Sequence, residues 1–116
     1  MFDKITIGNV EIPMTANAAT AIRYQQVFHE DLLALFARTM EDSEAIYVSQ
    51  KLGFIMKCQA EKADFSLVNY DQFIEWLEQF NALDFTGAAL PIIKLFQANE
   101  KTLSTPKKKA APPKEG

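Results

Sequence analysis

The sequence predicts a mainly α domain: a compact bundle of about four to five helices with a short N-terminal β-hairpin and a disordered C-terminal tail. Three observations predict it. Apolar residues recur at helical spacing along most of the chain, two β-rich runs surround a Gly-Asn pair near the N-terminus, and the apolar pattern stops beyond Asn99. We therefore expect one helical domain over residues 1–103, followed by a flexible tail over residues 104–116, which is rich in Lys, Pro and Ala.

The N-terminal residues read as a hairpin. Phe2–Ile7 alternates between apolar and polar residues, and residues 10–12 form a second short β-rich run after Gly8 and Asn9. A Gly-Asn pair between two such runs favours a tight turn. Pro13 is expected to end the second strand, because proline cannot donate a hydrogen bond to a ladder.

Two helices are predicted next. Thr15 or Asn17 can cap the first, which runs to about His29, and Asp31 can cap a short second one that reaches Met40. The apolar positions of this stretch are Ala21, Ile22, Tyr24, Phe28, Leu32, Leu35 and Phe36.

The third long helix is predicted over residues 44–60, with Ser43 as its cap. Its broad apolar face indicates a central helix that is contacted from two sides. Gly53 within it favours a close crossing with a neighbour. Its apolar residues form two stripes: Val48, Leu52, Ile55 and Met56, and Tyr47, Phe54 and Cys58. In the following loop, over residues 61–68, two side chains are expected to turn inward: Phe65 and Leu67.

The aromatic stretch from Asn69 to Phe96 is predicted to be a helical hairpin around which the rest of the chain packs. Asn69 is a plausible N-cap, and Gln72 three residues later gives a capping-box pattern. Pro91 leaves two alternatives for the second helix. Either Asp84 starts a helix that kinks at Pro91, or, as we favour, a helix starts near Leu90 with the proline in its first turn. The face of the first helix is formed by Phe73, Trp76, Leu77 and Phe80.

Residues suited to catalysis or metal binding are sparse. His29 is the one histidine and lies at a predicted helix end, and Cys58 lies on an apolar helix face as an inert core thiol. Asp71, Glu75 and Glu78 are neighbours on one helix, which is typical of a solvated face. The sequence therefore predicts no enzyme, no cofactor and no metal site.

The charge is unevenly distributed. The net charge is −3, but the last twelve residues carry four Lys against one Glu, so the remaining body is at −6. An acidic body argues against a nucleic-acid binder, whose surface is expected to be basic. The sequence has no apolar run long enough to span a bilayer and no signal peptide, and its single Cys fits a reducing cytoplasm.

Three segments carry a resemblance to a known family. FIEWLEQFNALDF, ALPIIKLF and AATAIRYQQVFHEDLL resemble segments of the tail assembly chaperones of long-tailed phages and of prophages of Gram-positive bacteria, over roughly residues 2 to 98. The positions that match the family pattern are Ala21, Ile22, Tyr24, Phe28, Leu32, Phe73, Trp76, Leu77, Phe80, Leu90 and Pro91.

The resemblance implies a mainly helical protein that acts in the host bacterial cytoplasm and is absent from the mature virion. Such a protein keeps the tape measure protein soluble and helps tail tube protein subunits polymerise around it. The family has no catalytic residues. We expect the aromatic and apolar positions to be core, with a docking groove for a partner as the alternative. The candidates for either role are Tyr24, Phe28, Phe73, Trp76, Leu77, Phe80, Leu90 and Phe96.

Many family members are made in a short form and a form extended by a programmed frameshift. Lys107, Lys108 and Lys109 can be encoded by an A-rich slippery heptamer, which would give a frameshift-extended form of this chain as a further partner. A short basic tail of no special use is the other interpretation. The gene sequence distinguishes the two interpretations. A frameshift requires an A-rich heptamer across codons 107–109 and an overlapping −1 reading frame that stays open well past codon 116.

Two other functions remain open from the sequence. One is a structural tail or adaptor protein that is retained in the virion, and the other is a small helical protein-binding regulator. A chaperone gene is expected between the gene of a tail tube protein and a very long tape measure gene.

Overall fold

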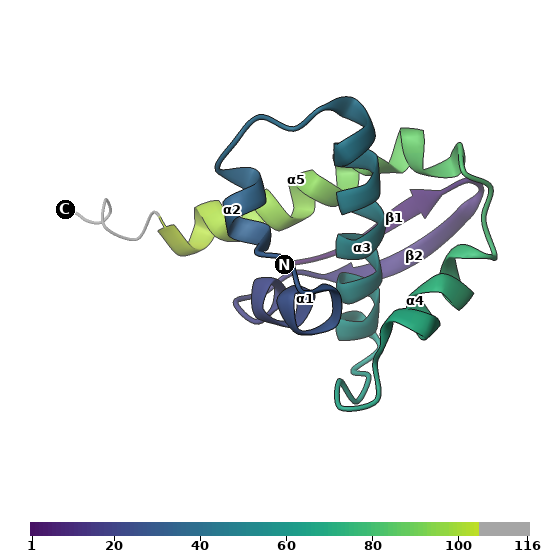
Figure 1. Ribbon diagram of the computed structural model, residues 1–116, viewed down its shortest axis with the longest axis horizontal. Helices are drawn as coiled ribbons and strands as arrows, with labels where there is room; N and C mark the ends of the chain where they lie inside the picture. Colours follow the sequence, from purple (N-terminus) through teal and green to yellow (C-terminus); the bar gives the residue numbers. More distant parts are fainter. Residues whose placement is uncertain (105–116) are drawn as a thin grey trace.

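Figure 1 shows the computed structural model, which describes the backbone of residues 1–104 and the side chains of residues 1–99. The described part has five helices and one two-stranded antiparallel sheet, which confirms the predicted mainly α fold with an N-terminal hairpin. The expected tail and Lys107–Lys109 lie outside the described residues, apart from Ser104 at the end of the last helix. The elements are β1 (Phe2–Ile7), β2 (Val10–Thr15), α1 (Thr20–Phe28), α2 (Leu32–Phe36), α3 (Asp42–Ala60), α4 (Tyr70–Leu77) and α5 (Asp84–Ser104).

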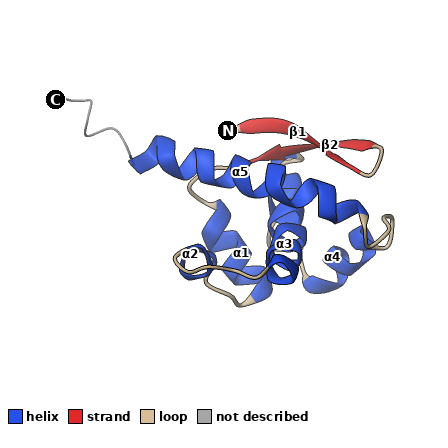
Figure 2. Cartoon of the chain, turned by 90° about the horizontal axis from the view of Figure 1, so that it is seen from above, coloured by secondary structure: helices blue, strands red, loops and turns tan. Residues whose placement is uncertain are grey.

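The hairpin forms a layer of its own on one side of the helices (Figure 2). Its inward face is apolar, and β1 packs on α5 while β2 packs on α3. Gly8 in the turn has a positive φ of 65°, which glycine adopts without steric cost. The buried residues of the hairpin are Ile5, Ile7, Ile12 and Met14.

Pro13 does not end the second strand, contrary to the prediction, because β2 continues to Thr15. Met1 and Ala16 exchange two backbone hydrogen bonds of 2.7 and 2.8 Å. Hydrogen-bonded and non-hydrogen-bonded pairs alternate in an antiparallel ladder, so the pair of Lys4 and Pro13 is not hydrogen-bonded. The nitrogen of Pro13 therefore lies at the outer edge of β2, where no donor is needed.

The first two helices are shorter than expected. Thr15 belongs to β2, and α1 begins only at Thr20 because Asn17 forms a turn in which its side chain accepts a hydrogen bond from the Ala19 N–H at 2.9 Å. The predicted cap of α2 is confirmed: Asp31 accepts from the Ala34 N–H at 3.1 Å. However, α2 ends at Phe36, and Met40 packs against the core from the loop.

The central helix is α3, as predicted, and it contacts β2, α1, α4 and α5. It begins at Asp42, so the prediction that Ser43 caps it is wrong. Glu41 occupies the cap position without a side-chain bond, and Asp42 and Glu44 place negative charge in the first turn. Gly53 permits the close crossing, because a Cβ atom there would lie 3.1 Å from Ile92 Cδ1 and 3.3 Å from Met14 Cε.

The predicted helical hairpin of α4 and α5 is not formed. Asn69 does cap α4, accepting from the Gln72 N–H at 3.0 Å. However, α5 crosses α3 and packs on β1 instead of lying along α4 (Figure 1). Near its start, α5 contacts this region through Phe85, whose ring lies 5.8 Å from that of Trp76 in α4 and 5.6 Å from that of Phe80, which follows α4.

The favoured start of the last helix near Leu90 is also wrong, because α5 begins at Asp84 and contains Pro91. Proline in a helix interior clashes with the carbonyl of the residue four positions earlier and leaves it without a donor. That residue is Gly87, and both Gly87 and Pro91 are exposed, so water can satisfy the freed carbonyl.

Of the two side chains expected to turn inward from the loop over residues 61–68, only one does so. Phe65 is half-buried, and the Arg23 guanidinium lies 4.3 Å from the centre of its ring. Leu67 does not turn inward: it is 66% exposed.

Candidate functional site

The structure places the predicted candidate residues mainly in the core. Seven of the eight are buried or half-buried, so most of their side-chain surface packs within the molecule. Leu90 is the exception, with 59% of its side chain exposed. The buried or half-buried candidates are Tyr24, Phe28, Phe73, Trp76, Leu77, Phe80 and Phe96.

Aromatic rings from four segments form one cluster in this core. The ring of Phe28 in α1 lies 4.9 Å from that of Phe73 in α4, and Phe54 in α3 lies 5.8 Å from Trp76. Phe54 and Phe85 complete the cluster, although they were not among the predicted candidates. Edge-to-face and tilted ring contacts of this kind stabilise a core and perform no chemistry.

Several of the buried polar groups form structural hydrogen bonds. The Tyr24 hydroxyl donates to Glu30 Oε1 at 2.9 Å, and Lys51 Nζ donates to the same oxygen at 3.0 Å. Burial, together with this hydrogen bond, raises the pKa of Tyr24. Gln59 Nε2 donates to the Thr15 carbonyl at 2.6 Å and to Thr20 Oγ1 at 2.9 Å, which ties α3 to β2 and α1.

The side chains considered for catalysis or metal binding lie in different parts of the described structure. His29 lies at the C-terminal cap of α1, as predicted, and Cys58 is buried, with its pKa raised by burial to about 11. Asp71, Glu75 and Glu78 are exposed on α4, as predicted. Within the described residues, no group of three or more His, Cys, Asp or Glu side chains could hold a metal ion.

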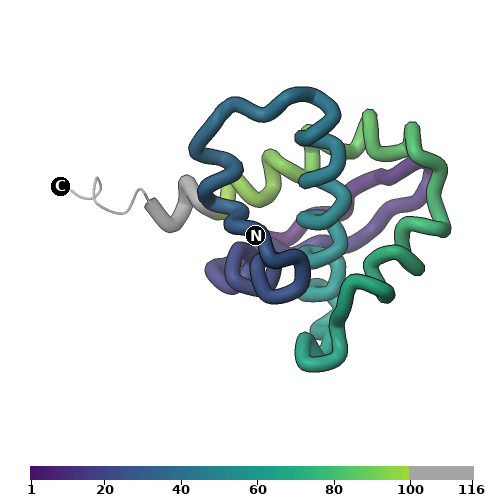
Figure 3. Tube along the Cα trace, viewed as in Figure 1, coloured from purple at the N-terminus to yellow at the C-terminus, as the bar shows by residue number. Residues whose placement is uncertain are grey.

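One candidate surface is a groove between β1 and α5, which run side by side (Figure 3). It consists of two hollows of about 430 and 650 Å³ that share Asp3, Ile5 and Pro91. We call it the β1–α5 groove. Its large exposed apolar side chains are Met1, Phe2, Leu83 and Leu90.

Sequence reasoning identified Leu90 but missed Met1 and Phe2, which are 51% and 61% exposed. The sequence did contain a signal that Phe2 is exposed, since alternation in β1 places it on the same face as the polar residues Lys4 and Thr6. The backbone N–H and C=O groups of these three residues point away from β2, because the pair of Met1 and Ala16 sets the alternation. The outer edge of β1 is therefore not paired with another strand of the described residues, although the Lys4 N–H donates to Asp3 Oδ1 at 2.8 Å.

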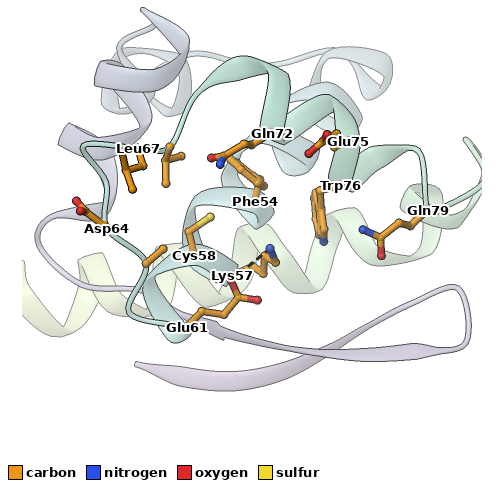
Figure 4. A pocket seen from close by; sticks show the side chains of 12 residues that line it. Phe54, Lys57, Cys58, Glu61, Asp64, Leu67, Gln72, Glu75, Trp76 and Gln79 are labelled. Atoms are coloured by element: carbon orange, nitrogen blue, oxygen red, sulfur yellow. Dashed lines mark ion pairs between the residues drawn. The ribbon is translucent and has the colours of Figure 1, made fainter.

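A second concave surface lies over Trp76, between α4, α3 and β2 (Figure 4). Two hollows of about 390 and 410 Å³ share Lys57, Glu61, Trp76 and Gln79, so they form one continuous trough. We call it the Trp76 trough. Leu67 lies at one end of it, and Val10, which is 48% exposed, lies at the other.

Comparison of the chain with protein-family models, with curated proteins and with solved structures finds no match. Among the helices of residues 1–104, none is long and apolar enough to cross a membrane.

Proposed function

We propose that this protein is a phage tail assembly chaperone, which binds the tape measure protein in the host bacterial cytoplasm and promotes tail tube assembly around it. The observation that carries the proposal is the β1–α5 groove. Its apolar side chains Met1, Phe2 and Leu90 are all more than half exposed, although the fold buries most of the other large apolar residues. The resemblance of three segments to this family gives the groove its proposed occupant.

The groove suits apolar segments of a long, unassembled chain. Exposed apolar side chains that gather in one groove are typical of sites for protein segments. Burial of apolar surface stabilises such a complex by about 25 cal/mol for each Å² removed from water. A tape measure segment covered in this way would no longer expose that surface to other chains, which keeps it soluble until tail tube subunits replace the chaperone.

The test is coexpression with the product of the very long gene expected beside this one. The wild-type chain should raise the soluble fraction of that protein. The double variant Phe2→Ser and Leu90→Ser should lose most of this effect, because it removes apolar contact area from the groove. Both residues are exposed, so the variant should fold as the parent does.

Leu33→Ser is the matched control, since Leu33 is 51% exposed on α2 and does not line the groove. It should behave as the wild type does. The wild-type effect should also survive moderate salt, because screening weakens charge contacts more than apolar ones. If the folded wild-type chain leaves the solubility of the tape measure protein unchanged, the chaperone function is ruled out. If the double variant is as active as the wild type, the groove is ruled out as the binding site.

The open edge of β1 favours a second candidate, a structural tail or adaptor protein that is retained in the virion. An unpaired strand edge can add a strand from a neighbouring subunit and so join an assembly. Mass spectrometry of purified particles separates the two functions. An adaptor is present in a fixed number per particle, whereas a chaperone is absent.

A further inference from the structure

The indole of Trp76 leaves one hydrogen-bond donor unused. Only 5% of the residue is exposed, and its Nε1–H has no acceptor among the described residues. Figure 4 shows the nitrogen directed into the trough, toward the space between Lys57 and Gln79. A buried Trp N–H usually finds a partner, and leaving one unpaired is unfavourable. A chain bound in the trough could supply the missing acceptor.

The trough is also acidic. Its lining contains the carboxylates of Glu11, Glu61, Asp64 and Glu75, and the lining cation Lys57 forms an ion pair with Glu61 at 3.3 Å. The lining therefore carries a net charge of −3. Hydrogen bonds from Ser66 to the Asp64 carboxylate lower its pKa, which favours the charged form. The trough is complementary to a cationic ligand.

The position of the free donor indicates an extended ligand. A helix uses its main-chain carbonyls internally, whereas an extended or polyproline II segment leaves them free to accept a bond from an indole. Aromatic-lined grooves bind proline-containing segments in this way. The floor of the Trp76 trough has this character, with Phe54 and Trp76 in one half and Phe80 beside Pro13 in the other.

The sequence contains one segment with the matching chemistry, residues 105–116. It carries four Lys, three Pro and one Glu, for a net charge of +3 against the −3 of the trough. Twelve residues in polyproline II conformation span at most about 37 Å. The described end of α5 lies on the side of the molecule away from α4, which forms one wall of the trough (Figure 1). The trough of a neighbouring molecule is therefore the more accessible one.

We propose that the Trp76 trough binds residues 105–116 of a second copy of this chain. Such a contact is heterologous, because the tail of one copy meets the trough of the next, and it can continue into longer assemblies. The contact depends on charge, so salt weakens it. The inference does not depend on the chaperone function, since it concerns a different surface and a different partner.

The test measures self-association of the full chain by sedimentation at low salt, together with the fluorescence of its single Trp. Association should shift the emission of Trp76 as its N–H gains an acceptor. The tail variant with Lys107, Lys108 and Lys109 each changed to Glu should raise the dissociation constant about tenfold or more. The trough variant Glu11→Lys with Glu75→Lys should do the same.

Two further samples make the test specific. The control variant Asp71→Lys with Glu78→Lys makes the same change in net charge at exposed positions of α4 and its C-terminal cap that do not line the trough, and it should associate as the wild type does. A mixture of the tail variant with the trough variant should regain association, because the intact tail of the trough variant can bind the intact trough of the tail variant, and the two reversed charges are also complementary.

Several outcomes would overturn the proposal. They are a full chain that stays monomeric at low salt, a control variant that weakens association as much as the trough variant, and a mixture that does not recover. A Trp76 emission that depends on the tail lysines but not on protein concentration would show that each tail occupies the trough of its own molecule, which also contradicts a second copy as the partner.

Discussion

Trp76 connects three parts of the core through its ring. It contacts Phe54 of α3, Phe80 after α4 and Phe85 of α5, at centroid distances of 5.8, 5.3 and 5.8 Å. Because α4 and α5 do not pair along their lengths, these contacts are where they are held together. The side chain is therefore important for stability, even though one edge of it faces the trough.

Trp76→Ala should lower the free energy of unfolding by roughly 3–5 kcal/mol, because it leaves a large cavity among these rings. That is a large share of the stability of a small domain. Chemical denaturation monitored by circular dichroism measures the change. A variant that unfolds like the parent yet no longer keeps the tape measure protein soluble would show that Trp76 is a contact residue instead.

Cys58 should react slowly in the native protein. Burial raises its pKa from 9.0 to about 11, so at pH 8 the thiolate should be about 100-fold rarer than in an ordinary thiol. The rate of alkylation by iodoacetamide, compared with the rate in urea, measures this difference. Equal rates would contradict the assignment of Cys58 as a core thiol.

The same shift has a consequence for stability. The native state favours the protonated thiol, so this contribution is fully present below pH 9.0 and is lost as the pH rises toward about 11. A Cys58→Ala variant should remove that part of the pH dependence.

Among the elements, α5 has the most unusual composition. It carries Pro91 in its interior, yet Phe85, Ile92 and Phe96 on its buried face anchor it on both sides of the proline. The packing of this face outweighs the local cost of the proline. The exposed face, where Gly87 and Pro91 lie, is available to absorb the distortion.

Pro91→Ala should therefore stabilise the protein by about 1–3 kcal/mol, since it restores a backbone donor and removes a steric clash without loss of core contacts. The thermal midpoint of unfolding measures the effect. Gln97→Ala, at another exposed position of α5 that does not line the groove, serves as the control. A lower midpoint for Pro91→Ala would show that the proline ring is needed in the β1–α5 groove.

For the whole molecule, the core extends from Ile5 in β1 to Phe96 in α5, so both ends of the described chain contribute to one cluster. The hairpin covers α3 and α5 on one side, and the shorter helices cover α3 on the other (Figure 2). Among the described side chains, those of residues 97–99 do not belong to this cluster.

Truncation after Leu103 should leave the thermal midpoint nearly unchanged, because the core cluster of the described residues lies before this point. Differential scanning calorimetry of a dilute sample, in which self-association is negligible, measures it. A drop of several degrees under these conditions would show that the removed residues pack on the body of their own molecule.

Patterns within short stretches of the sequence were sufficient to predict the features that depend only on neighbouring residues. The alternation around Gly8 and Asn9 predicts the hairpin, Asp31 and Asn69 predict two helix caps, and Gly53 predicts a close crossing. In each case the physical cause lies within a few residues: a turn conformation, a side-chain acceptor for a helix N-terminus, or a missing Cβ atom.

Tertiary packing decided the remaining features. Leu67 and Leu90 belong to apolar patterns, but the described residues leave them largely uncovered, so they are exposed. Pro91 lies inside a helix because its neighbours in α5 face the core. Neither the β1–α5 groove nor the Trp76 trough is contiguous in sequence, since each is lined by segments far apart in the chain. Exposure depends on which distant residues cover a side chain, and no periodicity within one segment contains that information.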